Sequence, residues 1–317
     1  MATLRTVTMN TGYDDYYTVS GLDWGGRGTQ HGFESVCSGK GISCARTAVA
    51  LALPVLAYGL IGRDDHDHFS AKLTAEGIAH RLFPVAGTAR HNLTLVDATG
   101  EKVAAHFMAA GYRLEPEAVT AMVDAVLAEA VPGDIVTLNG STAAGLPDDT
   151  WARLAGGLIA KGVRVIVDAQ GAALNAALTV PGVLTFKPNE DEILAIASVA
   201  AAVDPVAEAL AVFRESGALL PLVSQGAEGV SFLGADGGRV DATCAVANPV
   251  QSVMAGDAFV AGLVWGLLHA ADTADDDPAQ WVRHGLAAAA AHVAGLRGEE
   301  LLAQAKRNLA SVRFTTR

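Results

Sequence analysis

The sequence predicts an α/β fold with a mainly parallel sheet and helices on both faces. Its 317 residues are 51% hydrophobic but only 6% aromatic, so Ala, Val and Leu must form most of the core. This length allows one large α/β domain or two smaller ones. Short apolar runs alternate with helical stretches along the chain, which is the pattern of strand–helix–strand units.

The alternation is most regular between residues 134 and 257. Strand-like runs lie at 7–9, 55–58, 93–96, 135–138, 163–167, 183–186 and 220–223. Helical stretches lie at 42–51, 116–130, 147–160 and 205–216, and an apolar helix begins near Asp257 and ends near Asp272. In a sheet of this kind, ligands are expected at the carboxyl ends of the strands.

The first third of the chain has a different character. Residues 13–36 are rich in glycine and contain no long helical stretch, and residues 89–107 read as paired strands with a turn at 98–101. We expect these two segments to form a small sheet that projects from the main body.

The charge of the chain restricts its partners. A formal net charge of -12 and a pI near 5.1 argue against a broad surface for nucleic acid or anionic membrane. A phosphorylated ligand would therefore be held by a few local cations and backbone amides. The three cysteines form no C-x-x-C, residues 1–10 show no signal-peptide hydrophobic region, and the apolar run 258–271 is too short to span a bilayer. These observations predict a cytoplasmic protein without nucleic-acid or membrane partners.

The most informative stretch is the turn before the apolar helix, which places Asp257 in its first turn. The free N–H groups and positive dipole end of a helix form an anion site. A carboxylate there would repel an anion unless it had chemical work, such as taking a proton from a hydroxyl that attacks a phosphoryl group. The alternative is that Asp257 is an ordinary N-cap, which is the commoner use of this pattern.

Two glycine-containing loops fail the known nucleotide patterns. Lys40 is followed by Gly41 rather than Ser or Thr, so the P-loop pattern is absent, and His31 stands where a dinucleotide fingerprint would have its last glycine. The Gly39-Lys40-Gly41 turn can still bring backbone and a cation close to a ligand, although a plain turn into a helix explains it equally well.

Two later loops follow predicted strands. Asn189 and Glu192 are three residues apart in Lys187-Pro188-Asn189-Glu190-Asp191-Glu192, a spacing that predicts a capping box at a helix start. That role leaves open a second one, in which Glu192 orients a metal-bound water. The loop 224–229 follows another strand and either lies against a nucleotide or is only a hairpin turn.

In this order, the segments resemble the ribokinase-like phosphofructokinase B family, and most closely its branch of 1-phosphofructokinases and tagatose-6-phosphate kinases. The matching elements are Asn10 and Asp14, Gly39-Lys40-Gly41, Arg90 and Asn92, Gly140-Ser141, Asp168, Lys187 to Glu192, Ser224 to Gly229, and Ala255-Gly256-Asp257. The resemblance extends from Thr8 to the Ala-rich helix near His284.

The resemblance implies a single three-layer α/β/α domain over 1–317, with a β-sheet lid built from about 13–36 and 89–107. It implies ATP and Mg²⁺ as cofactors. Because an exposed small sheet needs cover and twofold dimers are the commonest assemblies, we also expect a homodimer formed through the outer face of the lid. By the same resemblance Asp257 is the catalytic base, and amides of Met254, Ala255 and Gly256 form an anion hole.

The resemblance also assigns binding residues. The acceptor side comprises Asp14, Gly39, Lys40, Ser43, Arg90, Asn92 and Asn139, with Asp14 on sugar hydroxyls and Lys40 and Arg90 on an existing phosphate. The nucleotide side comprises Lys187, Asn189, Ser224, Gly226, Glu228, Gly229 and His284, and Glu192 acts on the metal through water.

Several residues depart from the family pattern. Met254 stands where Gly is usual, Ser43 where Asn is usual, and Met108 where the branch often has Asn.

The motifs and the resemblance together predict an ATP-dependent kinase acting on a ketohexose phosphate, with fructose 1-phosphate as the first candidate. The alternatives are a kinase of tagatose 6-phosphate or of an unphosphorylated sugar, and a catalytically silent sugar- or nucleotide-binding protein.

Overall fold

A six-stranded parallel sheet forms the centre of the molecule in the computed structural model, which describes residues 2–21, 27–98, 103–273 and 277–317. Its strand order is β10-β9-β8-β1-β4-β5. The strands are β1 (Leu4–Thr8), β4 (Val55–Gly62), β5 (His80–Val85), β8 (Ile135–Asn139), β9 (Arg164–Asp168) and β10 (Thr185–Phe186). The predicted α/β architecture is therefore confirmed.

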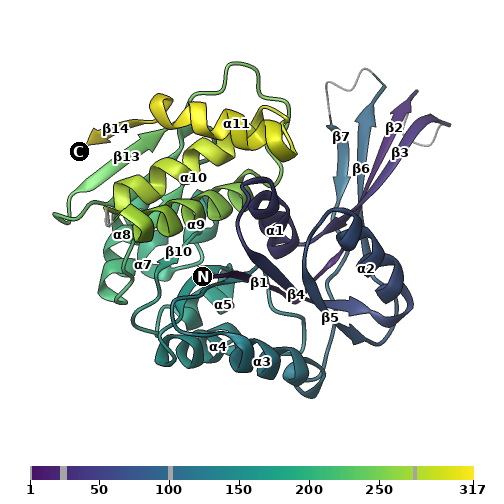
Figure 1. Cartoon of the computed structure of the whole chain (residues 1–317), viewed down its shortest axis with the longest axis horizontal. Helices are drawn as coiled ribbons and strands as arrows, with labels where there is room; N and C mark the ends of the chain where they lie inside the picture. The colour runs from purple at the N-terminus through teal and green to yellow at the C-terminus, as the bar shows by residue number, and fades with distance from the viewer. Residues whose placement is uncertain (1, 22–26, 99–102, 274–276) are drawn as a thin grey trace.

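Helices cover both faces of this sheet (Figure 1). One face carries α1 (Lys40–Ala50), α2 (His66–Ala75), α9 (Ala255–Thr273) and α10 (Pro278–Val293), with α11 (Gly298–Asn308) outside α10. The other carries α3 (Glu117–Glu129), α4 (Thr150–Ala160), α5 (Gly171–Ala177) and α8 (Pro205–Glu215), while α6 (Glu190–Ile193) and α7 (Ala197–Ala200) are short.

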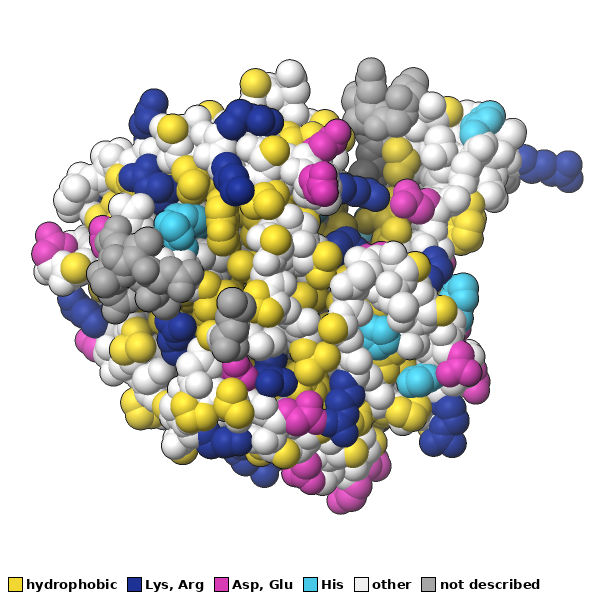
Figure 2. Space-filling view, in the orientation of Figure 1, with side chains coloured by type: hydrophobic (Ala, Val, Ile, Leu, Met, Phe, Trp, Pro, Cys, Tyr) yellow, Lys and Arg dark blue, Asp and Glu magenta, His cyan; other side chains and the backbone are white. Residues whose placement is uncertain are grey.

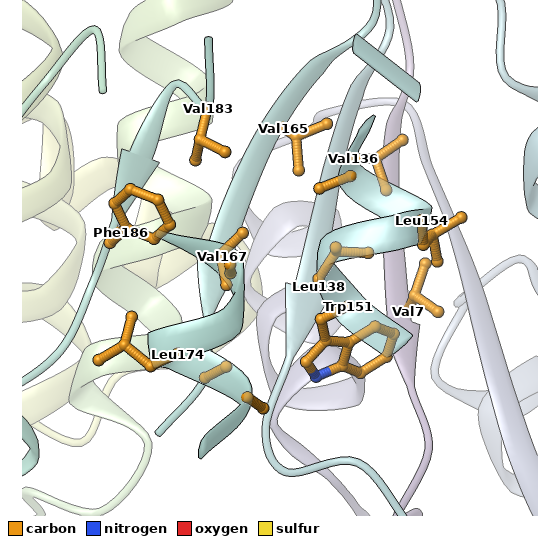
Figure 3. Close-up of a cluster of buried hydrophobic side chains, with 14 of the residues drawn as sticks. Val7, Val136, Leu138, Trp151, Leu154, Val165, Val167, Leu174, Val183 and Phe186 are labelled. Atoms are coloured by element: carbon orange, nitrogen blue, oxygen red, sulfur yellow. The ribbon is translucent and has the colours of Figure 1, made fainter. Parts of the chain in front are cut away.

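The two faces have separate cores because strand side chains alternate in direction. In β8, Val136 and Leu138 pack under α4, where Trp151 is fully buried (Figure 3), whereas Ile135 packs under α9 and α10. Small side chains allow α9 and α10 to pack closely, since a Cβ atom on Gly262 would lie 2.7 Å from Ala288 Cβ.

The predicted small sheet also forms. Its order is β3-β2-β6-β7, with β2 (Gly12–Ser20), β3 (Thr29–Ser38), β6 (Arg90–Asp97) and β7 (Val103–Phe107). The pairing of β2 with β6 is parallel and sets Asp14 opposite Asn92. This sheet, called the lid here, projects from the body beyond β4 and β5 (Figure 1). Most of the predicted turn at 98–101 lies outside the described residues.

The region after α8 corrects one expectation. The predicted strand 220–223 appears as β11 (Leu222–Ser224), but it belongs to a second, antiparallel sheet with β12 (Val230–Leu233), β13 (Arg239–Thr243) and β14 (Arg313–Thr316). The regular parallel alternation therefore stops before Asp257. A further strand, β5, was not predicted because Pro84 interrupts its pattern, and a proline is tolerated there because β5 is an edge strand.

Asn10 fastens the base of the lid to the body. Its amide donates to Ser141 O at 3.1 Å and to Thr142 O at 3.2 Å, and its Oδ1 accepts from Tyr112 N at 3.0 Å. Three chain segments that lead to or from the lid and the central sheet therefore meet at one side chain. Within the described ranges, no helix is long and apolar enough to cross a bilayer.

Candidate active site

A cavity of about 500 Å³ opens at the carboxyl edge of the central sheet, between the lid and the body. Figure 2 shows the surface hollowed where these two parts meet. The lid end of the cavity is lined by Asp14, Arg90 and Asn92. The far end is lined by residues of the 187–192 and 224–230 segments, and the start of α9 lies between the two ends. The position agrees with the expectation for an open α/β sheet.

The turn before α9 is held by α10. His292 Nε2 lies 2.8 Å from Val253 O, and the amides of Val250 and Gln251 donate to Val293 O at 2.8 and 3.2 Å. Met254 then adopts a left-handed backbone with φ 65°, after which α9 begins at Ala255. The N–H groups of Gly256 and Asp257 have no intrahelical acceptor at this point of a helix, so they can bind an anion.

A second helix begins at the same place. Helix α1 starts at Lys40, two residues before the predicted start, after Gly39 with φ 133°. A Cβ atom on Gly41 would lie 2.2 Å from Thr8 Oγ1, so only glycine lets α1 approach β1 this closely. Because α1 and α9 pack together, the positive ends of two helix dipoles converge on one cavity.

Asp257 is buried in the first turn of α9. Burial and the nearby Asp168 carboxylate raise the pKa of Asp257 to about 8, against the opposing effect of Lys40 and Lys187. A carboxyl group with its pKa near neutrality suits a general base, because it holds a proton well enough to remove it from a hydroxyl.

Asp168 lies within ion-pair distance of both lysines of the site. Lys40 Nζ donates to its Oδ1 at 2.9 Å, and Lys187 Nζ lies 3.5 Å from the same atom. Asp168 is fully buried, which by itself would raise its pKa, but Lys187 and Lys40 together hold the pKa below its usual value. Glycine at position 256 leaves room beside this cluster, since a Cβ atom there would lie 3.1 Å from Lys187 Nζ.

The lid end of the cavity offers an acid, an amide and a guanidinium. Asn92 Nδ2 donates to Asp14 Oδ1 at 2.6 Å, which fixes the buried carboxylate of Asp14. The Arg90 guanidinium donates to Asn10 O at 3.2 Å and to Ala109 O at 3.4 Å. Burial lowers the pKa of Arg90 while Asp14 raises it. Carbonyls thus orient Arg90 without neutralising its charge.

The far end of the cavity combines polar loops with an apolar wall. Asn189 and Glu192 form the predicted capping box, with Glu192 N donating to Asn189 Oδ1 at 2.8 Å and Asn189 N to Glu192 Oε2 at 2.9 Å. Glu192 Oε1 remains 3.6 Å from Lys40 Nζ, so the cap leaves one oxygen facing the cavity. Ser224, Gly226 and Gly229 line the same end.

Most of the predicted site residues are brought together, but three lie outside the cavity. The Asn139 amide donates within the sheet, to Thr137 O at 2.7 Å, and lies beneath the start of α1. His284 Nδ1 lies 2.7 Å from Gln280 O and its ring packs on Trp265. Glu228 ends a short 3-10 turn with its side chain exposed.

The cavity also contains residues to which the sequence analysis gave no role. Ser38 and His106 line the lid end, and Val230, Phe259 and Leu286 form an apolar wall at the far end. Phe259 had a signal, because it follows Asp257 by two residues in α9. The others are brought in by tertiary packing, which no local pattern reveals.

A resident metal cage is not found among the described residues, which hold no group of three or more His, Cys, Asp or Glu side chains suited to a metal ion. Asp168 Oδ2 is buried without a hydrogen-bond partner, and Glu192 Oε1 lies 3.6 Å from the Lys40 ammonium that also pairs with Asp168 Oδ1. Two such carboxylates fit Mg²⁺ bound chiefly by nucleotide phosphates, because Mg²⁺ keeps several of its own waters.

Known proteins are similar to this chain in sequence and in fold. The chain is 33% identical over 272 residues to a 1-phosphofructokinase of Xanthomonas campestris, with 83% of each chain covered. It is 27% identical over 267 residues to the 1-phosphofructokinase of Haemophilus influenzae, with 84% of each covered. The phosphofructokinase-2 of Escherichia coli, solved with fructose-6-phosphate, has a similar fold with a TM-score of 0.86 at 22% identity, covering 98% of this chain and 99% of that one.

The family assignment follows from a match over most of the chain. Residues 13–297 match the pfkB family carbohydrate kinase profile, and this range contains the lid, both helix N-termini and Asp257. The fold of the solved relatives agrees with the three-layer body and lid described above. The chain therefore belongs to the pfkB family of carbohydrate kinases, enzymes that transfer a phosphoryl group to an alcohol group of a sugar.

Proposed function

We propose that the protein transfers the γ-phosphoryl group of ATP to a hydroxyl of a ketohexose phosphate, with fructose 1-phosphate as the first candidate. The observation that carries this proposal is the position of Asp257, which lines the cavity beside the unpaired amides at the start of α9, between residues of the lid and the 187–192 and 224–230 segments. A base and an anion site are thus adjacent at the point where an acceptor and a donor would meet.

The acceptor is assigned to the lid end. Asp14 and Asn92 supply an acceptor and a donor for sugar hydroxyls, while Arg90 and Lys40 supply positive charge for a phosphate already on the sugar. In an acidic protein, cations gathered in one cavity favour an anionic ligand. The names of the 1-phosphofructokinase relatives agree with this assignment.

The donor is assigned to the far end. The apolar wall of Val230, Phe259 and Leu286 suits an adenine ring, and Ser224, Gly226 and Gly229 let backbone approach the nucleotide. Bound Mg²⁺ would neutralise phosphate charge, with Asp168 and Glu192 facing its waters.

The residues then act together in a single phosphoryl-transfer step. Asp257 accepts the proton of the acceptor hydroxyl while that oxygen forms a bond to the γ-phosphorus and the bond from phosphorus to the ADP oxygen breaks. The amides of Gly256 and Asp257, together with Lys187, stabilise the charge on the transferred group. The proton is then on the Asp257 carboxyl, and the electron pair of the broken bond remains on the ADP oxygen.

A screen of acceptors by ADP release tests the proposal. The purified protein would be assayed with MgATP and fructose 1-phosphate, fructose 6-phosphate, tagatose 6-phosphate, fructose and tagatose, with product identity checked by NMR. We expect the highest kcat/KM with fructose 1-phosphate. A preference for tagatose 6-phosphate or for a free sugar would overturn the acceptor, and binding without turnover of any sugar would identify a silent binding protein.

We further propose that the outer face of the lid meets a second copy of the chain. Tyr16 and Thr18 face the body, so Tyr17 faces outward, where it packs on Phe33 with ring centroids 4.8 Å apart. Phe33 and Phe107 are 54% and 52% exposed. An apolar face on a four-stranded sheet needs cover, and twofold dimers are the commonest assemblies. A solved phosphofructokinase-2 form is described as tetrameric.

A further inference from the structure

A second cavity of about 320 Å³ lies beside the active site, between the lid and the helices α1 and α11. Its walls combine charged or titratable side chains with polar and apolar ones. They are Glu34, Arg46, His292 and Arg297, the polar Thr18, Thr47 and Gln251, and the apolar Leu296 and Leu301. Ser43 and Met254 line both this cavity and the active-site cavity, so the two spaces adjoin at these two residues.

Ser43 and Met254 contact one another across that junction. Ser43 Oγ, on the buried face of α1, donates to Met254 Sδ at 3.0 Å. Met254 belongs to the turn that α10 holds in place, and Ser43 belongs to the helix that begins with Lys40. The contact therefore joins the two helix starts of the active site at the boundary between the two cavities.

The backbone at this position does not favour methionine. With φ 65° Met254 is one of two non-glycine residues in the left-handed region in the described part of the chain, and glycine would adopt this conformation without strain. A glycine would also present the same backbone to a phosphate. What methionine adds is only its side chain, so a role for this residue must lie in the space that the side chain fills.

We propose that the Met254 and Ser43 side chains form a partition that limits the length of the acceptor. The inference rests on the proposed function, since it concerns the acceptor of that reaction. With the partition in place, a ketose phosphate of six carbons fits and a longer one collides with it. Without the Met254 side chain the two cavities join, and the hydroxyls and aliphatic side chains beyond would accommodate an additional CHOH unit.

The test compares acceptors that differ by one carbon. Sedoheptulose 1-phosphate is paired with fructose 1-phosphate, and sedoheptulose 7-phosphate with fructose 6-phosphate, so that the chain is extended at either end. For each pair the ratio of kcat/KM for the longer acceptor to that for the shorter one is measured, because this ratio cancels any common loss of activity. A misfitting carbon unit in a pocket costs about 10–200-fold in kcat/KM.

We expect Met254→Gly to raise this ratio by at least about 10-fold for one pair, and Met254→Ala to do the same. Met254→Leu, which refills the space, should keep the wild-type ratio, and thermal unfolding would establish that each variant is folded. An unchanged ratio for both pairs in the folded Gly and Ala variants would overturn the partition.

The failure of the proposed function would look different. It would show as turnover of fructose, but not of its phosphates, by the wild-type enzyme, and the ratio would then be measured for sedoheptulose against fructose. Equal effects of Leu and Gly would also refute the partition, since they would point to the thioether rather than to the space it fills.

Discussion

Lys40 and Asp168 are joined by a 2.9 Å ion pair at the centre of the site, with the carboxylate fully buried and the lysine at the first position of α1. Asp168 also raises the pKa of Asp257, which lies close enough to feel its charge. Asp168 thus positions the Lys40 ammonium and raises the pKa of the Asp257 carboxyl. The pH dependence of activity separates the second effect from the first.

We expect kcat/KM to increase about tenfold per pH unit at low pH and to level off above about 8, the pKa of Asp257, because the base must be ionised to accept a proton. In Asp168→Asn this limb should move to lower pH, since a negative charge near Asp257 is removed. Rate profiles between pH 5.5 and 9.5 would measure both. Asp149→Asn, at an exposed carboxylate that pairs with Arg153, should leave the limb in place.

The second prediction concerns Asp257 itself. Asp257→Asn should lower kcat by at least ~10²-fold, the lower end for general-base catalysis, with little change in ATP affinity. Steady-state kinetics and calorimetric titration with a nonhydrolysable ATP analogue would measure the two quantities. Asp277→Asn provides the control, because Asp277 caps α10 outside the cavity and asparagine caps equally well. Near-normal kcat in Asp257→Asn would leave Asp257 as a structural residue.

Asp257→Asn, which should lower kcat, should also raise the stability of the folded protein relative to the wild type as pH rises. The folded pKa of Asp257 is raised, so its contribution to stability is complete below the unfolded pKa and is lost as pH rises through about 8. Asparagine carries no charge to bury. The difference in Tm between Asp257→Asn and the wild type should therefore increase from pH 5 to pH 9, as followed by differential scanning calorimetry. A difference that is constant or decreases with pH would contradict the burial of a titrating carboxyl.

Arg90 tests whether the acceptor carries a phosphate. Its guanidinium lines the cavity and is oriented by two backbone carbonyls. Removing a charge-assisted contact costs ~1.5–3 kcal/mol, or roughly ten- to a hundredfold in kcat/KM. Arg90→Ala should show this loss with fructose 1-phosphate and almost none in the slow turnover of fructose. Equal losses on both acceptors would indicate that Arg90 supports the lid rather than the substrate.

The lid interface gives a fifth prediction. Phe33→Glu places a charge on the outer apolar face and should convert dimers to monomers, as measured by light scattering during size-exclusion chromatography. Val203→Glu changes an even more exposed apolar residue, between α7 and α8, and should leave the assembly unchanged. A Phe33→Glu protein that keeps the wild-type mass would exclude this face as the interface.

The sequence predicts those parts of the fold that depend on local pattern. Buried strands such as β8 and the helices after Pro116, Pro147 and Pro205 follow from apolar runs and helix starts, and the capping box at Asn189 follows from spacing alone. The antiparallel sheet after Ser224 was not anticipated, because short strands of mixed polarity carry the same pattern in either direction.

The site residues likewise divide into those that local sequence patterns predict and those that depend on tertiary packing. Loops that end strands or begin helices were found, since parallel strands deliver them to one edge. Whether a side chain turns into the cavity was not predictable. Asn139 ends β8, just before such a loop, and its amide donates to Thr137 O and Val7 O within the sheet. Met254 was seen as a departure, but its contact with Ser43 depends on two segments separated by 211 residues.

The parallel pairing of β2 with β6 has a consequence for how the protein folds. The hairpins β2–β3 and β6–β7 are local and can form early, but Asp14 and Asn92 are 78 residues apart in the chain. Contacts of such sequence separation form slowly because the intervening chain must first be ordered. Here that chain contains α1, β4, α2 and β5, so we expect the half of the site assigned to the sugar to assemble only after this part of the body has formed.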